Sequence, residues 1–400
     1  MAEAQQVGTP VLRRINTAAV LNAVRRSAPT LVRLSELVEL TGLTRPTVVK
    51  AVDHLLESGW LQQHAPETSS QFLGRPAIRL SLRGRAAPVL GLDVGPHTVT
   101  AGIADLAGEQ LAVVRRSVHR NGAQPLLRVI REVTIEALAA AGVQADEIAM
   151  VIAATPGLVD ARSGRILLAP SVPGWTSIDL AEHLRSQFDC PVQVENDANL
   201  AALALAHERA PSGTLLAVQW GERLGGGVVI DGRLHRGSGS AGEIGFIQLP
   251  GQPLAATNGR GPLERTIGAA AITELGRRAG IEHPESRLSG CPLDAAAVFA
   301  AAADGDPAAV EVVNQVASIF AQAVAPAVLV LAPDVIVIGG GVARAGAALL
   351  EAANRHLKML TLTPPSLEVS GLAENTVLTG ALQMALDEVW RQLLATGPTN

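Results

Sequence analysis

The hydrophobic positions of the first 85 residues recur at the spacing of α-helices. They predict two short helices, from Thr17 to Arg26 and from about Leu34 to Thr41, with Ser35 as a candidate cap for the second. Gly42 then marks a tight turn. It is followed by a third helix that buries the apolar side chains of Val48, Val49, Val52, Leu55 and Leu56. The pattern therefore predicts a helix-turn-helix, the motif that places one helix in the major groove of DNA.

The third helix predicts a DNA-contacting surface. Thr44 can cap this helix, Pro46 suits its first turn, and its exposed N-terminal face would carry Thr44, Arg45, Thr47 and Lys50. These residue types donate hydrogen bonds to phosphates and base edges. After Gly59, residues 60–64 and 77–82 predict two strands around a polar loop that contains Gly74, Arg75 and Pro76. We interpret this hairpin as a wing with Arg75 at its tip.

Beyond residue 85 the pattern changes to strands that alternate with helices. Residues 89–93 and 98–104 predict a glycine-cornered hairpin, and residues 215–219 and 228–230 repeat it, which suggests an internal duplication. The other expected elements are helices at 126–141 and 178–187 and a strand at 148–154. The expected organisation is a DNA-binding domain at 1–85 and a two-lobed α/β domain at 86–400, with lobe one at about 88–195 plus a C-terminal helix at 380–397, and lobe two at about 196–379.

Composition and charge narrow the class of protein. Hydrophobic residues make up 48% of the 400 residues and charged residues 17%, a profile of folded chains. Residues 1–85 hold 11 Lys or Arg against 6 Asp or Glu, whereas the remainder holds 21 against 31, so a polyanionic partner would meet the N-terminal part. Two cysteines are too few for a disulfide framework or a cysteine-rich zinc site. The N-terminus lacks an apolar leader, and the most apolar stretch, 319–350, is interrupted by prolines. We expect a cytoplasmic protein without a membrane partner.

A series of motifs identifies a family resemblance. In order along the chain they are LGLDVG at 90–95, PGLVD at 156–160, PGW at 173–175, VENDANLAALA at 194–204, GGGVVIDGRLHRGSGSAGEIG at 225–245 and PDVIVIGGGVA at 333–343. Together with the N-terminal pattern they closely resemble the ROK family of the actin-like sugar-kinase superfamily. The resemblance implies an N-terminal winged helix-turn-helix plus a two-lobed actin-like ATPase/sugar-kinase (ribonuclease-H-like) domain, and a wing arginine that enters a minor groove.

The resemblance also assigns roles to residues of the second domain. It implies that Asn196, Asp197, Glu243 and Glu264 hold a sugar, with Asp197 as the vestigial base that would accept a hydroxyl proton in a kinase. Carboxylates and amides suit this role because a sugar hydroxyl both donates and accepts hydrogen bonds. Taken singly, Glu243 and Glu264 could be surface acids, and Asn196 and Asp197 could be a helix cap.

The family pattern is broken at the sites that serve ATP and zinc. In the family, the glycine turns of the two hairpins contact the phosphates of ATP, and we call them phosphate corners. The first reads Asp-x-Gly-Gly-Thr in active relatives but ends in Pro96 and His97 here. The second has Glu222 and Arg223 in place of Thr-Gly. Proline removes a backbone donor, and an acid repels triphosphate. Phe246 stands where the family has a zinc-binding histidine that also touches sugar hydroxyls, and no cysteine occurs between Phe246 and Cys291. Ser171 replaces an asparagine before the PGW motif. We expect neither a cofactor nor a metal.

Three functions remain open at this stage. The leading hypothesis is a DNA-binding transcription regulator of carbohydrate metabolism, a repressor in preference to an activator, controlled by a sugar or sugar derivative and without kinase activity. The first alternative is an active ATP-dependent sugar kinase with a DNA-binding module. The second is a ligand-independent DNA-binding protein that uses the kinase-like domain as an oligomerisation scaffold. In the leading hypothesis the partners are a double-stranded DNA operator and a small-molecule sugar, bound by a homodimer or homotetramer.

Overall fold

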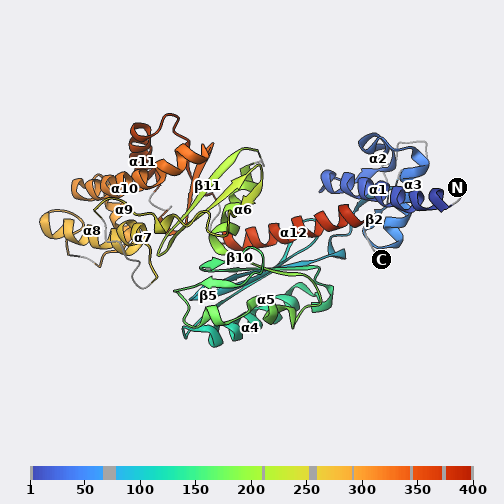
Figure 1. Ribbon diagram of the computed structural model, residues 1–400, viewed down its shortest axis with the longest axis horizontal. Helices are drawn as coiled ribbons and strands as arrows, with labels where there is room; N and C mark the ends of the chain where they lie inside the picture. Colours follow the sequence, from blue (N-terminus) through green and yellow to red (C-terminus); the bar gives the residue numbers. More distant parts are fainter. Residues whose placement is uncertain are drawn as a thin grey trace.

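The computed structural model describes residues 3–65, 78–209, 212–251, 259–290, 292–342, 346–371 and 375–397. Their strands form a three-stranded sheet, two five-stranded sheets and a two-stranded pair. Figure 1 shows the N-terminal helices at one end of the molecule and the second five-stranded sheet with its helices at the other. The first five-stranded sheet lies between and below them.

The N-terminal part consists of three helices and a small antiparallel sheet of order β1-β3-β2. Its elements are α1 (Glu3–Ser27), β1 (Val32–Arg33), α2 (Leu34–Thr41), α3 (Arg45–Glu57), β2 (Leu61–His64) and β3 (Arg79–Leu82). The predicted turn is confirmed, because Gly42 ends α2 with a φ of +66° and donates its N–H to Val38 O over 3.0 Å.

Two local predictions in this part were wrong, and one strand was missed. Helix α1 begins at Glu3 and not near Thr17, and β1 was not predicted. Ser35 lies inside α2 and does not cap it. At that end the side chain of Glu36 accepts a hydrogen bond from the backbone N–H of Arg33 over 2.8 Å, so the cap comes from the third residue of the helix.

The first five-stranded sheet has the order β10-β7-β4-β5-β6. Its strands are β4 (Val89–Val94), β5 (Thr98–Ala104), β6 (Gln110–Ser117), β7 (Met150–Thr155) and β10 (Val192–Asn196), and the pair β8 (Leu158–Val159) and β9 (Ile166–Leu168) lies beside it. Strands β4, β5 and β6 pair antiparallel, whereas β7 and β10 run parallel to β4. Helices α4 (Ala123–Ala141) and α5 (Leu180–Arg185) cover the face that is lower in Figure 1.

The second five-stranded sheet repeats this arrangement in the order β13-β12-β11-β14-β15. Its strands are β11 (Thr214–Trp220), β12 (Leu224–Ile230), β13 (Arg233–His235), β14 (Val335–Gly339) and β15 (Ser366–Val369). Again three antiparallel strands precede two strands parallel to the first. This common topology supports the predicted duplication. The helices attached to this sheet are α7 (Pro262–Ile267), α8 (Ala269–Glu282), α9 (Ala295–Ala303), α10 (Pro307–Leu331) and α11 (Gly346–Leu360).

Short 3₁₀ turns complete the described chain. They are η1 (Gly84–Ala86), η2 (Ala145–Glu147), η3 (Trp175–Ser177) and η4 (Ile244–Phe246). Within the described ranges, α10 alone is long and apolar enough to cross a membrane by composition, but 56% of its apolar window is buried inside the fold. Its side chains Val316 and Phe320 are fully buried, so α10 serves as a core helix of the second lobe.

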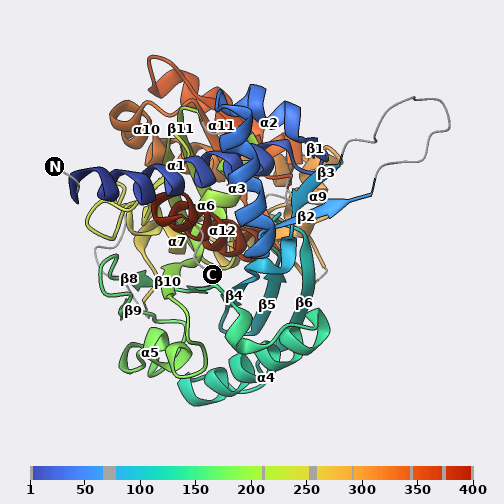
Figure 2. The ribbon, with the colours of Figure 1, turned by 90° about the vertical axis from the view of Figure 1, so that its right-hand side faces the viewer.

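Two helices connect the sheets with the N-terminal part. Helix α6 (Asp197–Arg209) is buried along nine consecutive residues, from Ala198 to Ala206. Helix α12 (Thr376–Thr396) begins at Thr376 and not at residue 380, and it packs on α6 and on β4 and β7. Its buried side chains Leu382 and Trp390 share one hydrophobic cluster with Leu21 of α1. Figure 1 shows α12 running from the centre of the molecule to the N-terminal helices, and Figure 2 shows it close to end-on beside α1.

Candidate functional sites

The start of α3 presents the predicted DNA-binding side chains. Thr44, Arg45 and Lys50 are exposed and Thr47 is half-buried, while Val48, Val52 and Leu55 are buried on the opposite face. The amphipathic pattern therefore orients the helix as predicted. The hydroxyl of Thr44 does not cap α3, because it bonds to the Thr47 hydroxyl over 2.8 Å.

The predicted wing can be followed only at its base. Strands β2 and β3 pair antiparallel, with Leu61 opposite Leu82 and His64 opposite Arg79. Arg75, together with its neighbours Gly74 and Pro76, lies outside the described residues. Its role on DNA stays a prediction.

The four predicted sugar-binding residues line one cavity of about 540 Å³. They come from different elements: Asn196 ends β10, Asp197 begins α6, Glu243 precedes η4, and Glu264 lies in α7. The cavity is also lined by Gly157 and Leu158 of the first lobe and by Arg223 and Gly225 of the second, so both lobes contribute to it. Sequence reasoning thus grouped four residues that are up to 68 positions apart, from Asn196 to Glu264.

The amide of Asn196 holds the floor of this cavity together. Its Nδ2 donates to Gly157 O over 2.8 Å and to Asp197 Oδ1 over 3.2 Å, while its Oδ1 accepts from Asn199 N over 3.0 Å. Asp197 Oδ1 also accepts the N–H of Ala198 at 2.8 Å. Asn196 therefore fixes the carboxylate of Asp197 at the start of α6.

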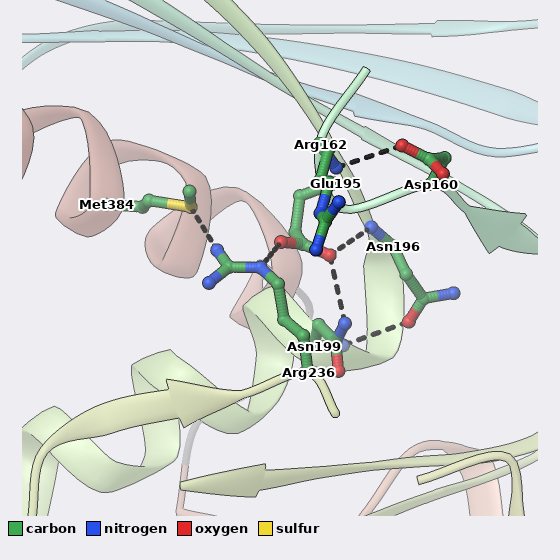
Figure 3. A network of polar contacts seen from close by, with 7 residues as sticks. All are labelled: Asp160, Arg162, Glu195, Asn196, Asn199, Arg236 and Met384. Carbon is green, nitrogen blue, oxygen red and sulfur yellow. Dashed lines mark hydrogen bonds and ion pairs between the residues drawn. The ribbon is translucent and has the colours of Figure 1, made fainter. Parts of the chain in front are cut away.

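A buried ion pair supports Asn196 from below. Arg236 Nε donates to Glu195 Oε2 over 2.5 Å, and Glu195 Oε1 accepts from the backbone N–H of Asn196 and from Asn199 Nδ2, both over 2.9 Å (Figure 3). Arg236 Nη2 also lies 3.9 Å from the sulfur of Met384 on α12. Glu195 and Arg236 stand in the quoted motifs, but sequence reasoning assigned them no role. The two residues are 41 positions apart, and no local sequence pattern indicates that they are in contact.

Glu264 is the most deeply buried acid of the cavity, with a side chain 3% exposed. Its Oε2 accepts the N–H of Leu224 at 3.3 Å, and its Oε1 lies 3.5 Å from Arg223 Nε but accepts no hydrogen bond within the described part of the chain. The Nε2 of Gln219, another lining residue, is also buried without a partner there. A hydroxyl-bearing ligand would satisfy such groups, because a buried polar atom without a partner costs about 1–3 kcal/mol.

Burial raises the pKa of three carboxyls that line the cavity. Burial, followed by the neighbouring Asp93, raises the pKa of Asp197 to about 6. Burial also raises the pKa of Glu243 and of Glu264, and Arg223 lowers the pKa of all three acids. Arg223 is thus the shared counter-charge of the cavity, a role that sequence reasoning missed because it assigned this residue to a phosphate corner.

The two phosphate corners offer few donors to an anion. In the first, the N–H of Gly95 bonds to Thr98 O over 2.9 Å, and Pro96 has no N–H. In the second, the N–H of Gly221 bonds to Arg223 O over 3.0 Å, and Glu222 pairs with Arg260 at 3.2 Å. Arg223 Nη2 donates to Gly259 O over 3.0 Å.

The histidine expected by the family pattern is replaced by Phe246, which lines the cavity. Within the described ranges no group of three or more His, Cys, Asp or Glu side chains is placed to hold a metal ion. Cys291 lies outside these ranges. The absence of zinc stays a prediction.

Comparisons with known proteins agree with this architecture. The model of the ROK family matches residues 89–388, and the IclR helix-turn-helix model matches residues 15–65. A glucokinase of Thermotoga maritima is 31% identical over 64% of this chain and 83% of its own length. A xylose repressor of Caldicellulosiruptor bescii is 23% identical over 95% and 97%. A solved ROK family transcriptional regulator, described as a homologue of the Escherichia coli MLC protein, is 23% identical and superposes with a TM-score of 0.78 over 96% of this chain and 98% of its own.

Proposed function

Since the chain belongs to the ROK family and carries a helix-turn-helix, we propose that it is a transcription regulator that has lost kinase activity and is controlled by a sugar or sugar derivative bound between its lobes. The observation that carries this proposal is α12, because one helix joins the cavity to the DNA-binding part. Its second residue, Val377, lines the cavity, whereas Trp390 near its other end packs against α1.

The contacts of α12 with α1 support a mechanical connection. The guanidinium of Arg25 lies 4.6 Å from the centre of the Trp390 ring and 3.9 Å from the carboxylate of Asp387. The indole N–H of Trp390 donates to Leu106 O over 3.2 Å, which ties the same side chain to the first lobe. In the proposal, a ligand that closes the lobes moves α12 and thereby alters the spacing of paired recognition helices on DNA.

Arg45 and Lys50, with Thr44, Thr47 and Arg75, are the proposed DNA-binding residues. Residues 1–85 are the proposed DNA-binding domain and residues 86–400 the proposed ligand-binding domain. We further propose that the protein acts in the cytoplasm as a homodimer or homotetramer, since helix-turn-helix proteins read palindromic operators as symmetric pairs.

Kinase activity is the alternative that the 31% identical glucokinase favours. Asp197, the base that a kinase would use, is retained at the cavity floor. The phosphate corners weigh against it, because Pro96 and Glu222 replace donors with a tertiary amide and a negative charge. We therefore propose that the cavity binds its ligand without phosphorylating it.

The decisive experiment combines ligand screening with DNA binding by the full-length protein. Thermal-shift screening against sugars, amino sugars and sugar phosphates identifies a ligand, since any ligand that binds the folded state raises the melting temperature. Its effect is then measured on the affinity for a duplex selected from a random library. We expect a change of roughly 5- to 150-fold, the usual range of allosteric coupling.

The variant Asp197→Ala locates the sensing site. It should lose the ligand response and keep ligand-free DNA affinity within about twofold, because Asp197 lies in the cavity and away from α3. A full ligand response in this variant would place the sensor elsewhere. If no compound of the panel stabilises the wild-type protein, the scaffold alternative is favoured.

A further inference from the structure

Besides the polar residues of its floor, the cavity is lined by apolar residues, which we call the apolar wall. Apolar residues of both lobes contribute to its lining, among them Pro156, Leu158, Leu168, Pro170, Phe246 and Val377. Ligand sites commonly combine such a wall with a few polar groups, in which case the wall binds the apolar part of the ligand.

Phe246 is the most unusual member of this wall. Aromatic residues make up 2% of the chain, and the large ones at the centre of the fold, Trp175, Trp220 and Phe320, are fully buried. Phe246 is 40% exposed, and it is the sole aromatic residue among the exposed large apolar side chains of the described part. Because Phe246 lines the cavity, a bound ligand can cover its exposed ring, and such burial of apolar surface is favourable.

The backbone holds Phe246 in place. Its N–H donates to Glu243 O over 3.1 Å, so the ring is attached directly to the turn that carries a floor carboxylate. The preceding residue, Gly245, packs so closely on Gly261 that a Cβ built on Gly261 would lie 2.1 Å from Gly245 O. The backbone that carries the ring is therefore fixed relative to both Glu243 and the residue that precedes α7.

The first lobe supplies apolar partners for the same cavity. Leu158 and Leu168 are cross-strand neighbours in the β8–β9 pair, and Leu168 is 44% exposed. Phe246 belongs to the second lobe, so the two lobes each contribute exposed apolar surface. The volume of about 540 Å³ lies within the range of roughly 300–1,000 Å³ that holds drug-sized ligands.

We propose that the ligand is a glycoside with a bulky apolar aglycone, and that Phe246 determines this specificity. The inference rests on the proposed sugar control and names the ligand class of that site. The sugar hydroxyls bind the carboxylates and amides of the floor, while an aryl aglycone packs against Phe246 and the Leu158–Leu168 pair. Phenylalanine has no hydrogen-bonding group, so at this position it stabilises an apolar substituent of the ligand and cannot bind a further hydroxyl.

The test compares matched glycosides. Phenyl and methyl β-glycosides of the same hexoses and pentoses are titrated calorimetrically into the full-length protein. For the sugar that binds, we expect the phenyl glycoside to bind roughly tenfold more tightly, because its ring buries additional apolar surface. In Phe246→Ala this preference should fall below about threefold, while the affinity for the methyl glycoside stays within about twofold.

A control variant separates this effect from a general loss of apolar surface. Leu360→Ala removes a side chain that is 43% exposed on α11 and does not line the cavity, and it should leave the preference unchanged. Equal affinities of the two glycosides for the wild-type protein, or an unchanged preference in Phe246→Ala, would overturn the inference and leave sugar control intact. If neither kind of glycoside binds and the wider sugar panel is also inactive, the proposed function fails as well.

Discussion

Arg236 and Glu195 form an ion pair of 2.5 Å that joins the loop after β13 to the end of β10. The carboxylate of Glu195 is 8% exposed, and Arg236 is the cation paired with it, while Asn196 N and Asn199 Nδ2 donate to its other oxygen. The strand that carries Glu195 ends at Asn196, which lines the cavity, so the pair connects the two lobes next to a cavity residue. Figure 3 shows the contacts of Glu195 with Arg236 and Asn196.

Removing Arg236 should be strongly destabilising. Arg236→Ala leaves the buried charge of Glu195 unpaired, which costs about 3 kcal/mol of unfolding free energy. The double variant Glu195→Gln/Arg236→Met should recover part of this loss because no buried charge remains. Urea unfolding measures both, with Arg233→Ala on the exposed side of β13 as the control. A loss below about 1 kcal/mol in Arg236→Ala would contradict the role of the pair.

The recognition helix leads to a prediction about salt. Arg45→Ala and Lys50→Ala should each weaken binding to the selected duplex, and each lost phosphate contact should reduce the slope of log K against log salt by about 0.9. Mobility-shift titrations at several salt concentrations give this slope. Lys358→Ala, an exposed cation on α11, is the control. Unchanged affinity and slope in both helix variants would reject this placement of DNA.

Arg75→Ala tests the wing by another criterion. If Arg75 enters a narrow minor groove, its removal should weaken binding more on duplexes with A/T-rich flanks than on those with G/C-rich flanks. The two sets of duplexes share one core sequence and are compared in the same mobility-shift titration. An equal loss of affinity on both sets of duplexes would indicate that Arg75 contacts a phosphate. An unchanged affinity on both sets would show that Arg75 does not contact DNA.

Much of this architecture could be predicted from local patterns. The α3 helix and strands such as β5 agree with the sequence because amphipathic spacing and glycine turns are encoded within a few residues. The extension of α1 to Glu3 was missed because Gly8 and Pro10, two residues that disfavour helix interiors, interrupt this segment. The short β1 strand has only two residues, too few to give a pattern.

The cavity was predictable for a different reason. Asn196, Asp197, Glu243 and Glu264 were grouped through the order of family motifs, and no periodicity would have brought them together. The pairing of Glu195 with Arg236 and the turn of Arg223 towards Glu264 depend on tertiary packing. Such contacts leave no trace in the local sequence.

The phosphate corners predict the outcome of a kinase assay. A coupled ATP assay across common hexoses and pentoses should give no sugar-dependent ADP release above background, because Pro96 and Glu222 leave the phosphates without their donors. A glucokinase assayed in parallel shows that the conditions support turnover. Sugar-dependent ADP release that disappears in Asp197→Asn would establish an active kinase and refute the proposed loss.

The raised pKa of Asp197 makes stability depend on pH. Its pKa is about 6 in the folded protein against an ordinary value of 3.8, so between about pH 4 and 6 the unfolded chain releases a proton that the folded protein retains. The free energy of unfolding therefore falls as pH rises through this window and stays lower above it. The cause is burial and the nearby charge of Asp93, both of which oppose ionisation in the folded state.

Asp197→Asn should remove this dependence. The amide oxygen can still accept from Ala198 N, but no charge forms in the cavity. Relative to wild type, the variant should be little changed at pH 4 and more stable by up to about 3 kcal/mol at pH 7.5, as judged by urea unfolding at each pH. Asp189→Asn, at an exposed acid outside the cavity, is the matched control. If the unfolding free energies of variant and wild type differ by the same amount at both pH values, the pKa of Asp197 is not raised in the folded protein. A gain in stability that accompanies loss of ligand binding would instead indicate that this carboxylate is retained for recognition at the expense of stability.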